Sequence, residues 1–254
     1  MSRYTVDYCL GASSCRMKKL ISSLALLGLV ACGERPPEAA PLAAESFEAE
    51  CSRRLLPTEI HVRALPSQIS YNFDSTMAQL TYKTPKERRD GHVMLGLTES
   101  TLRTNINWNS NMLVRSSPQS ACLRPQVTLT FDVTPQIVSI AREFPKGSCS
   151  FNEIAAHEMR HVRANQAQLE AAAAYMEKEL KNFFQQKIFY GTPDTLKSQL
   201  EDALRTTWLP LAEQQLEKVN VVHEAIDSPE EYARNKTVCN GEITRIIYES
   251  GSIR

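Results

Sequence analysis

A long stretch without glycine or proline constrains this sequence more than any other feature. Neither residue occurs between Ser150 and Tyr190. Ser150 opens a Ser-Phe-Asn-Glu segment typical of a capping box, and one face then recurs at helical spacing. Its members are Ile154, His157, His161, Asn165, Ala172, Met176 and Phe183. The pattern predicts a helix of up to about 40 residues that begins at Ser150.

A second helical segment follows Gly191. Thr192 and Pro193 supply a helix cap with proline in the first turn, and apolar residues recur at helical spacing as far as Ile226. We expect this segment to fold back on the first helix as a hairpin, with a kink at Pro210. Ser228 then begins a short third helix, with Glu231 as its capping partner. Residues 150–254 are therefore predicted to be helical, although 241–248 could also be a strand.

The preceding region, 58–144, alternates between apolar and polar residues. A period of two is typical of half-buried strands. The clearest runs are 60–64, 69–73 and 127–133, and shorter candidates are 92–98, 105–108 and 136–144. The predicted fold class is therefore α+β, an antiparallel β-sheet half followed by a long α-helical hairpin.

The first 31 residues have the features of an export signal. Lys18 and Lys19 precede an apolar run, 20–31, which is too short to span a bilayer but typical of a signal peptide. Residues 1–16 precede a better start at Met17, where we expect translation to begin. The run ends in Leu-Val-Ala-Cys, which resembles the lipobox of bacterial lipoproteins, with Cys32 as the lipidated residue.

The resemblance to lipoproteins implies a location in the cell envelope. The chain would be anchored through Cys32 on the periplasmic side. The glycine at position 33, directly after this cysteine, resembles the sequences of lipoproteins that are sent to the outer membrane. Residues 32–50 are rich in proline, alanine and glutamate, which predicts a tether rather than a folded segment. Residues 51–254 are then expected to form a single domain. The lipid anchor is the only membrane contact that we expect.

The charge balance excludes one class of partner. The chain has 29 basic and 29 acidic residues, for a formal net charge of +0. Such a chain lacks the electrostatic field that attracts nucleic acid, so we expect no nucleic-acid partner.

Four cysteines remain after the leader and the lipidated residue. They are Cys51, Cys122, Cys149 and Cys239. An even number in an oxidising compartment predicts two disulfides, for which three pairings are possible. We favour Cys122 with Cys149, which would bracket a hairpin, and Cys51 with Cys239, which would tie the chain ends. A metal site is less favoured because no two of these cysteines have CxxC-like spacing.

The strongest chemical signal is His157-Glu158-Met159-Arg160-His161, an HExxH segment on the first predicted helix. Residues four apart lie on one helix face, so both imidazoles can bind one metal ion while Glu158 flanks it. This is the zincin arrangement, and it predicts one Zn²⁺ per chain. In such a site zinc-bound water attacks a carbonyl, and Glu158 acts as the general base.

A catalytic zinc site needs a third protein ligand. Folding the hairpin about Gly191 brings His223, Glu224 and Asp227 to the level of HExxH. We expect His223 to be the third ligand, because it lies between Val219 and Ile226 on the inward face. Asp227 would then accept a hydrogen bond from a ligand imidazole, and Glu224 is the alternative third ligand.

Several segments together resemble uncharacterised secreted bacterial families described as zinc-dependent proteases. These segments are the lipoprotein leader, Cys122-Leu-Arg-Pro125, Gly147-Ser-Cys149, the HEMRH segment and Ile226-Asp-Ser-Pro-Glu-Glu-Tyr232. The resemblance covers most of residues 55–245 and implies an envelope-tethered metallopeptidase acting on a peptide or protein substrate. By analogy with zincins, strand 136–144 would pair with an extended peptide.

Two alternatives remain open. One is a non-catalytic lipoprotein scaffold or binding protein, in which the helical hairpin packs on a partner through residues 171–174, all alanine. The other is a structural zinc ion, with Glu224 closing the fourth position. Replacing Glu158 separates a catalyst from both alternatives.

Overall fold

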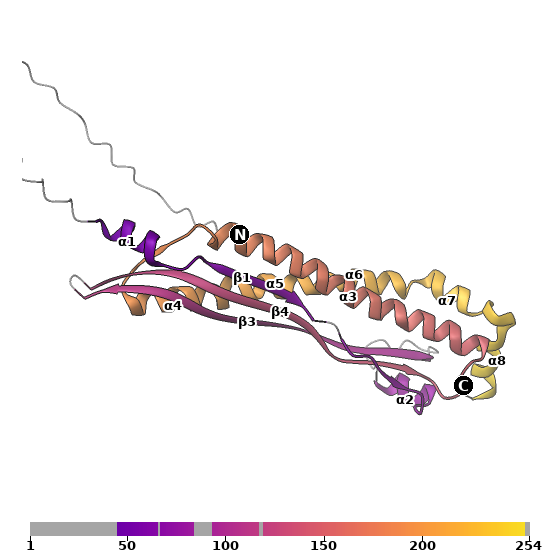
Figure 1. Ribbon diagram of the computed structural model, residues 1–254. Coiled ribbons are helices and arrows are strands. Elements are labelled where there is room, and N and C mark those ends of the chain that lie inside the picture. The colour runs from indigo at the N-terminus through magenta and orange to yellow at the C-terminus, as the bar shows by residue number, and fades with distance from the viewer. Residues whose placement is uncertain (1–44, 66, 84–92, 117–118, 252–254) are drawn as a thin grey trace, which may run out of the picture. The chain divides into compact units, whose positions relative to one another are not determined.

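Two long strands organise the sheet of this protein, a computed structural model of which describes residues 45–65, 67–83, 93–116 and 119–251. Strands β3 (Gly96–Arg115) and β4 (Ser120–Ile140) pair antiparallel along nearly their whole length, with a register shift between Ser100 and Leu102. The other edge of β4 pairs with β5 (Phe189–Gly191), β1 (Glu59–Ala64) and β2 (Ser70–Asn72). Figure 1 shows these strands running alongside the long helix α3.

The prediction of an antiparallel sheet is wrong. Strands β1 and β2 both run parallel to β4, so the sheet of five strands in the described residues is mixed. The chain that leaves β1 does not turn back but continues along β4 to β2 and then enters helix α2 (Met77–Lys83). Alternation shows which faces of a strand are buried and contains no information on the direction of its neighbour. Of the short predicted strands, 105–108 lies within β3, 92–98 overlaps β3 from residue 96 onward, and 136–144 overlaps β4 as far as residue 140.

The long helix is present as α3 (Cys149–Phe184). Its cap is Ser148, whose hydroxyl accepts a hydrogen bond from the amide of Phe151, so the cap lies two residues before the predicted one. Ser150 is buried in the first turn, and its amide donates to the carboxylate of Glu242.

The prediction of a single helical hairpin is also wrong. Thr192 caps α4 (Pro193–Ala203) as expected, but a π-helical turn (η1, Leu204–Trp208) separates it from α5 (Leu209–Glu217). Pro210 has no amide hydrogen to donate to the preceding turn, so the regular helical ladder cannot continue through it. As far as residue 251, where the described part ends, four further helical segments follow: α6 (Val219–Ile226), α7 (Pro229–Asn235), η2 (Val238–Gly241) and α8 (Glu242–Glu249). Helix α6 nevertheless lies against α3.

Two apolar clusters form most of the core. The larger one joins the second half of α3 to α4, α5 and the inward side chains of β4, and it includes Phe131, Met176 and Leu180. The smaller one joins α2, the end of β4, the first turns of α3 and α8, and it includes Phe144 and Phe151. Between the two clusters, α3 buries polar residues instead, Glu158 and Asn165.

The four cysteines form two disulfides, as expected, but the favoured pairing is wrong. Cys51 pairs with Cys122, and Cys149 pairs with Cys239. Helix α1 (Phe47–Arg54) packs its buried Cys51 on β4, while η2 lies at the N-terminus of α3. The pairing therefore depends on which cysteines lie close together in the folded chain, although they are far apart in the sequence.

The predicted leader 1–31 and the lipidation residue Cys32 lie outside the described residues, and α1 begins within the segment that we expected to be a tether. Among the residues described, no helix combines the length and the apolar character needed to cross a membrane.

Candidate metal centre

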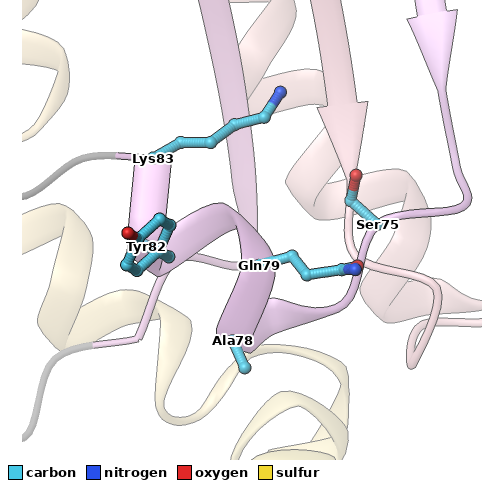
Figure 2. Close-up of a pocket in the computed structure, with 5 residues that line it drawn as sticks. All are labelled: Ser75, Ala78, Gln79, Tyr82 and Lys83. Atoms are coloured by element: carbon cyan, nitrogen blue, oxygen red, sulfur yellow. The ribbon is translucent and has the colours of Figure 1, made fainter.

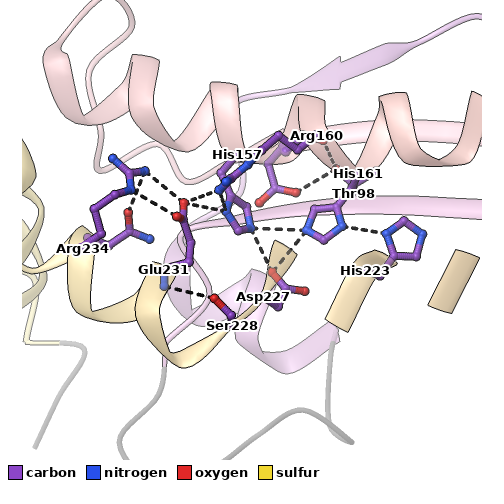
Figure 3. A network of polar contacts seen from close by, with 11 residues as sticks. Thr98, His157, Arg160, His161, His223, Asp227, Ser228, Glu231 and Arg234 are labelled. Atoms are coloured by element: carbon purple, nitrogen blue, oxygen red, sulfur yellow. Dashed lines mark hydrogen bonds and ion pairs between the residues drawn. The ribbon is translucent and has the colours of Figure 1, made fainter. Parts of the chain in front are cut away.

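Three ligand atoms from two helices converge on one point. His157 and His161 lie one turn apart on α3, and their Nε2 atoms are 3.3 Å apart. Asp227, the C-cap of α6, lies opposite them, with its Oδ1 atom 3.0 Å from Nε2 of His157 and 3.2 Å from Nε2 of His161. Figure 3 shows the carboxylate pointing between the two rings.

This donor set is suited to zinc. Zinc binds imidazole nitrogen and carboxylate oxygen at about 2.0–2.2 Å in a tetrahedron, whose edges are then about 3.3–3.6 Å long. The three separations of 3.0, 3.2 and 3.3 Å are close to such edges. Both imidazoles are mostly buried, whereas Asp227 is 42% exposed, so the site opens to solvent on the α6 side. The three residues can therefore hold a metal ion and leave a fourth position open.

The structure places the two predicted downstream residues in exchanged positions. His223, the expected third ligand, lies on the other side of the His161 ring, with its Nδ1 atom 2.9 Å from Nδ1 of His161. Asp227 lies within hydrogen-bond distance of both imidazoles, as expected, but it does so at their Nε2 atoms, where a metal ion would bind. Glu224 is exposed on α6. The geometry thus favours Asp227 as the third ligand.

Glu158 is held between α3 and the sheet. Its side chain is buried, and its Oε2 atom accepts a 2.7 Å hydrogen bond from the hydroxyl of Thr98 on β3. Gly96 permits this close approach, because a Cβ atom at position 96 would lie 2.5 Å from Oε1 of Glu158. Burial raises the pKa of the Glu158 carboxyl, although the Thr98 hydrogen bond and the nearby imidazoles oppose the shift.

A charged group supports the outer side of His157. Nδ1 of His157 lies 3.3 Å from a carboxylate oxygen of Glu231 on α7, and Glu231 also pairs with Arg160 and Arg234. Hydrogen bonds from Arg234, and further ones from Arg160 and His157, lower the pKa of Glu231 to about 2. Ser228 does cap α7, but it accepts from the amide of Glu231, whose carboxylate is turned toward α3. The contacts of the Glu231 carboxylate with His157, Arg160 and Arg234 were not predicted from the sequence.

The site couples its histidines to its carboxylates electrostatically. Burial lowers the pKa of His157, but hydrogen bonds and charges from Asp227, Glu158 and Glu231 outweigh it and raise the pKa overall. Burial would raise the pKa of Asp227, but hydrogen bonds from His157 and His161 hold it well below its usual range. Burial, together with the neighbouring His161, lowers the pKa of His223. The carboxylate of Asp227 is therefore ionised, as a metal ligand must be.

Two other features do not belong to this site. Cys149, Cys239 and Glu242 lie close together, but both sulfur atoms are joined in a disulfide and offer no thiolate to a metal. A pocket beside α2 is lined by Ser75, Ala78, Gln79, Tyr82 and Lys83 and contains none of the predicted site residues (Figure 2).

The strand expected to pair with a peptide has no free edge. Residues 137–139 of β4 pair with β2 on one side and with β3 on the other. Within the described residues β3 and β2 each pair only with β4, so each has an outer edge, and both lie near Glu158: Thr98 of β3 contacts Glu158 itself, and Tyr71 of β2 contacts Met159.

Sequence reasoning missed the residues that come from β3, because nothing local indicates which strand covers Glu158. Thr98 and Gly96 belong to this group. Asn165 did give a signal, since it is a polar residue on the otherwise apolar face of the predicted helix.

Comparisons of the chain with protein-family models, with curated proteins and with solved structures found no match.

Proposed function

We propose that this protein is a zinc-dependent hydrolase that cleaves peptide bonds in the bacterial cell envelope. The observation that carries the proposal is the convergence of His157, His161 and Asp227 at separations of 3.0–3.3 Å, with Glu158 next to His157 on the same helix. When bound, zinc supplies Lewis acidity, which polarises a carbonyl group and lowers the pKa of water.

The remaining chemistry belongs to the side chains. His157, His161 and Asp227 hold the ion. Glu158 takes a proton from the attacking water at Oε1, while Thr98 holds the other carboxylate oxygen through its 2.7 Å hydrogen bond. Glu158 then gives the proton to the leaving amine. For this transfer the Oε1 atom must turn from Gly96 of β3 toward the metal centre, while Thr98 keeps its hydrogen bond to Oε2.

The substrate class follows from the edge of the sheet. An extended peptide can pair with the outer edge of β3 and so place its backbone near Glu158. Cys32 would tether the protein to the periplasmic side of the envelope. A change of Cys32 to Ser should move the protein from the membrane fraction to the soluble fraction.

A second candidate function is that of a non-catalytic metal-binding scaffold. One observation favours it: Glu158 is only 5% exposed and is hydrogen-bonded to Thr98, as a purely structural glutamate would be. In this case the metal centre would hold α6 against α3 without chemistry.

The change Glu158→Gln separates the two functions. The amide keeps the shape of the side chain but cannot accept the proton, so we expect cleavage of a fluorescently labelled, unfolded protein substrate to fall about 10²- to 10⁴-fold. Zinc content should stay at one ion per chain. Glu170→Gln is the matched control on α3, because Glu170 lies outside the metal centre and its carboxylate accepts an exposed hydrogen bond from Gln166. Absence of cleavage in both wild type and Glu158→Gln, with one zinc ion bound to each, would support the scaffold.

A further inference from the structure

A chain of buried polar contacts leads from the metal centre into the protein. His161 contacts His223 through their Nδ1 atoms at 2.9 Å, and His223 Nε2 lies 3.0 Å from Oδ1 of Asn165. Asn165 in turn donates from Nδ2 to the hydroxyl of Ser100 on β3 at 3.0 Å. Asn165 is 1% exposed, so water does not compete at the two contacts that Asn165 makes. The contacts connect α3, α6 and the sheet.

The chemistry of each group gives this chain a direction. Oδ1 of Asn165 can only accept, so Nε2 of His223 must carry the hydrogen that it donates. A neutral His223 with its hydrogen on Nε2 has a lone pair on Nδ1. Nδ1 of His161 must then donate to that lone pair.

The same direction determines which atom of His161 faces the metal centre. A neutral imidazole with hydrogen on Nδ1 has its lone pair on Nε2. Nε2 of His161 is the atom that lies 3.2 Å from Asp227 and 3.3 Å from His157. A metal ion would take the place of the hydrogen shared between Nε2 and Asp227, and the ring would then present its Nε2 lone pair to the point where the three ligand atoms converge.

We propose that His223 and Asn165 are positioning residues that hold His161 in the Nδ1–H tautomer and so prepare its Nε2 atom for a metal ion. This inference rests on the proposed metal centre and extends it to residues that do not touch the ion. His157 has a different support, the carboxylate of Glu231 at its Nδ1 atom. The two ligand imidazoles are thus oriented in two ways. The charged Glu231 orients His157, and the neutral chain of His223, Asn165 and Ser100, which we call the relay, orients His161.

The first test compares zinc affinity among variants of the whole protein, measured by competition with a coloured chelator. Asn165→Leu removes the acceptor but keeps a similar branched shape, and we expect zinc to bind about 10- to 100-fold more weakly. Asn165→Asp keeps an oxygen acceptor for His223, so its affinity should stay near that of wild type. Gln166→Leu is the matched control, since it removes an amide from the next residue of α3, where the contact is with exposed Glu170.

The second test reads the hydrogens directly and needs no variant. Long-range ¹H–¹⁵N correlation spectra of histidine-labelled wild type distinguish protonated from unprotonated ring nitrogens. We expect hydrogen on Nε2 of His223 with and without zinc, and hydrogen on Nδ1 of His161 in the loaded protein. Zinc affinity unchanged by Asn165→Leu, or hydrogen on Nδ1 of His223, would overturn the relay. A wild type that binds no zinc would overturn the proposed function, while the spectra of the metal-free protein would still decide on the relay.

Discussion

The two halves of α3 use the same helix face for different purposes. In the second half, the residues turned toward the sheet are apolar and completely buried, as Leu169, Met176 and Leu180 show. In the first half, the corresponding face buries Glu158 and Asn165, while His157 and His161 flank it. Burial of polar groups lowers stability unless each one has a partner. The comparison teaches that the second half of α3 is packed as core, whereas the first half combines core packing at Phe151, Ile154 and Val162 with a polar site.

We expect the largest effect when a proposed metal ligand is removed from the first half of α3. His157→Ala leaves two of the three converging atoms, so we expect zinc content to fall from one ion per chain to almost none. The free energy of unfolding of the metal-free protein should change less than with a core substitution, because this side chain packs mainly against other polar groups. Elemental analysis and urea unfolding measure the two quantities. Retention of tightly bound zinc by this variant would remove the distinction between the halves.

The opposite pattern is expected in the second half. Leu180 is completely buried in the larger apolar cluster, and Leu180→Ala should lower the free energy of unfolding by about 2–5 kcal/mol. The zinc affinity of the folded protein should be unchanged, since the change leaves the first half intact. Urea unfolding of the metal-free variant, followed by chelator competition, checks both statements. A zinc affinity that falls together with stability would mean that the two halves are coupled.

The disulfides provide a third comparison, because they hold different ends of the fold. Cys149 and Cys239 tie the start of α3 to the segment that follows Asp227 and Glu231, whereas Cys51 and Cys122 tie α1 to β4. Replacing either pair with serine should cost about 2–4 kcal/mol of stability. We expect weaker zinc binding only when Cys149 and Cys239 are replaced. Equal zinc affinities in the two double variants would contradict this expectation.

The smallest expected effect concerns the space beside Glu158. In Gly96→Ala, the new Cβ atom would meet Oε1 of Glu158 at 2.5 Å and Cγ2 of Ile154 at 2.8 Å. We expect a loss of about 1–3 kcal/mol in stability and slower hydrolysis, because Glu158 must move away from Thr98. Gly191→Ala is the control, since its Cβ atom would meet only the flexible Leu196 side chain, at 3.2 Å. If both variants behave alike in stability and rate, the packing of Gly96 does not position Glu158.

Local patterns predicted the elements of this fold better than their arrangement. The absence of glycine and proline after Ser150 correctly indicated α3, and the alternation around Val127 and Leu129 correctly indicated β4. The direction of β1 and β2 and the pairing of the cysteines depend on contacts between distant segments. No local pattern contains that information.

The same limit applies to the site. HExxH placed His157, Glu158 and His161 on one helix, and folding back about Gly191 brought the region of His223 and Asp227 to the correct level. A choice between those two residues needs the end of α6, where the chain leaves the helix and turns Asp227 toward the imidazoles. Helical spacing cannot predict the direction of a side chain at a helix end, because the backbone there is no longer helical.

The central claim is that Asp227 binds the metal ion and that His223 supports a ligand. Zinc dissociation constants of wild type, Asp227→Ala and His223→Phe, measured by the same chelator competition, test it most directly. The account predicts that Asp227→Ala loses zinc as completely as His157→Ala, whereas His223→Phe binds it about 10- to 100-fold more weakly than wild type. Complete loss of zinc in His223→Phe, together with nearly unchanged affinity in Asp227→Ala, would contradict the account.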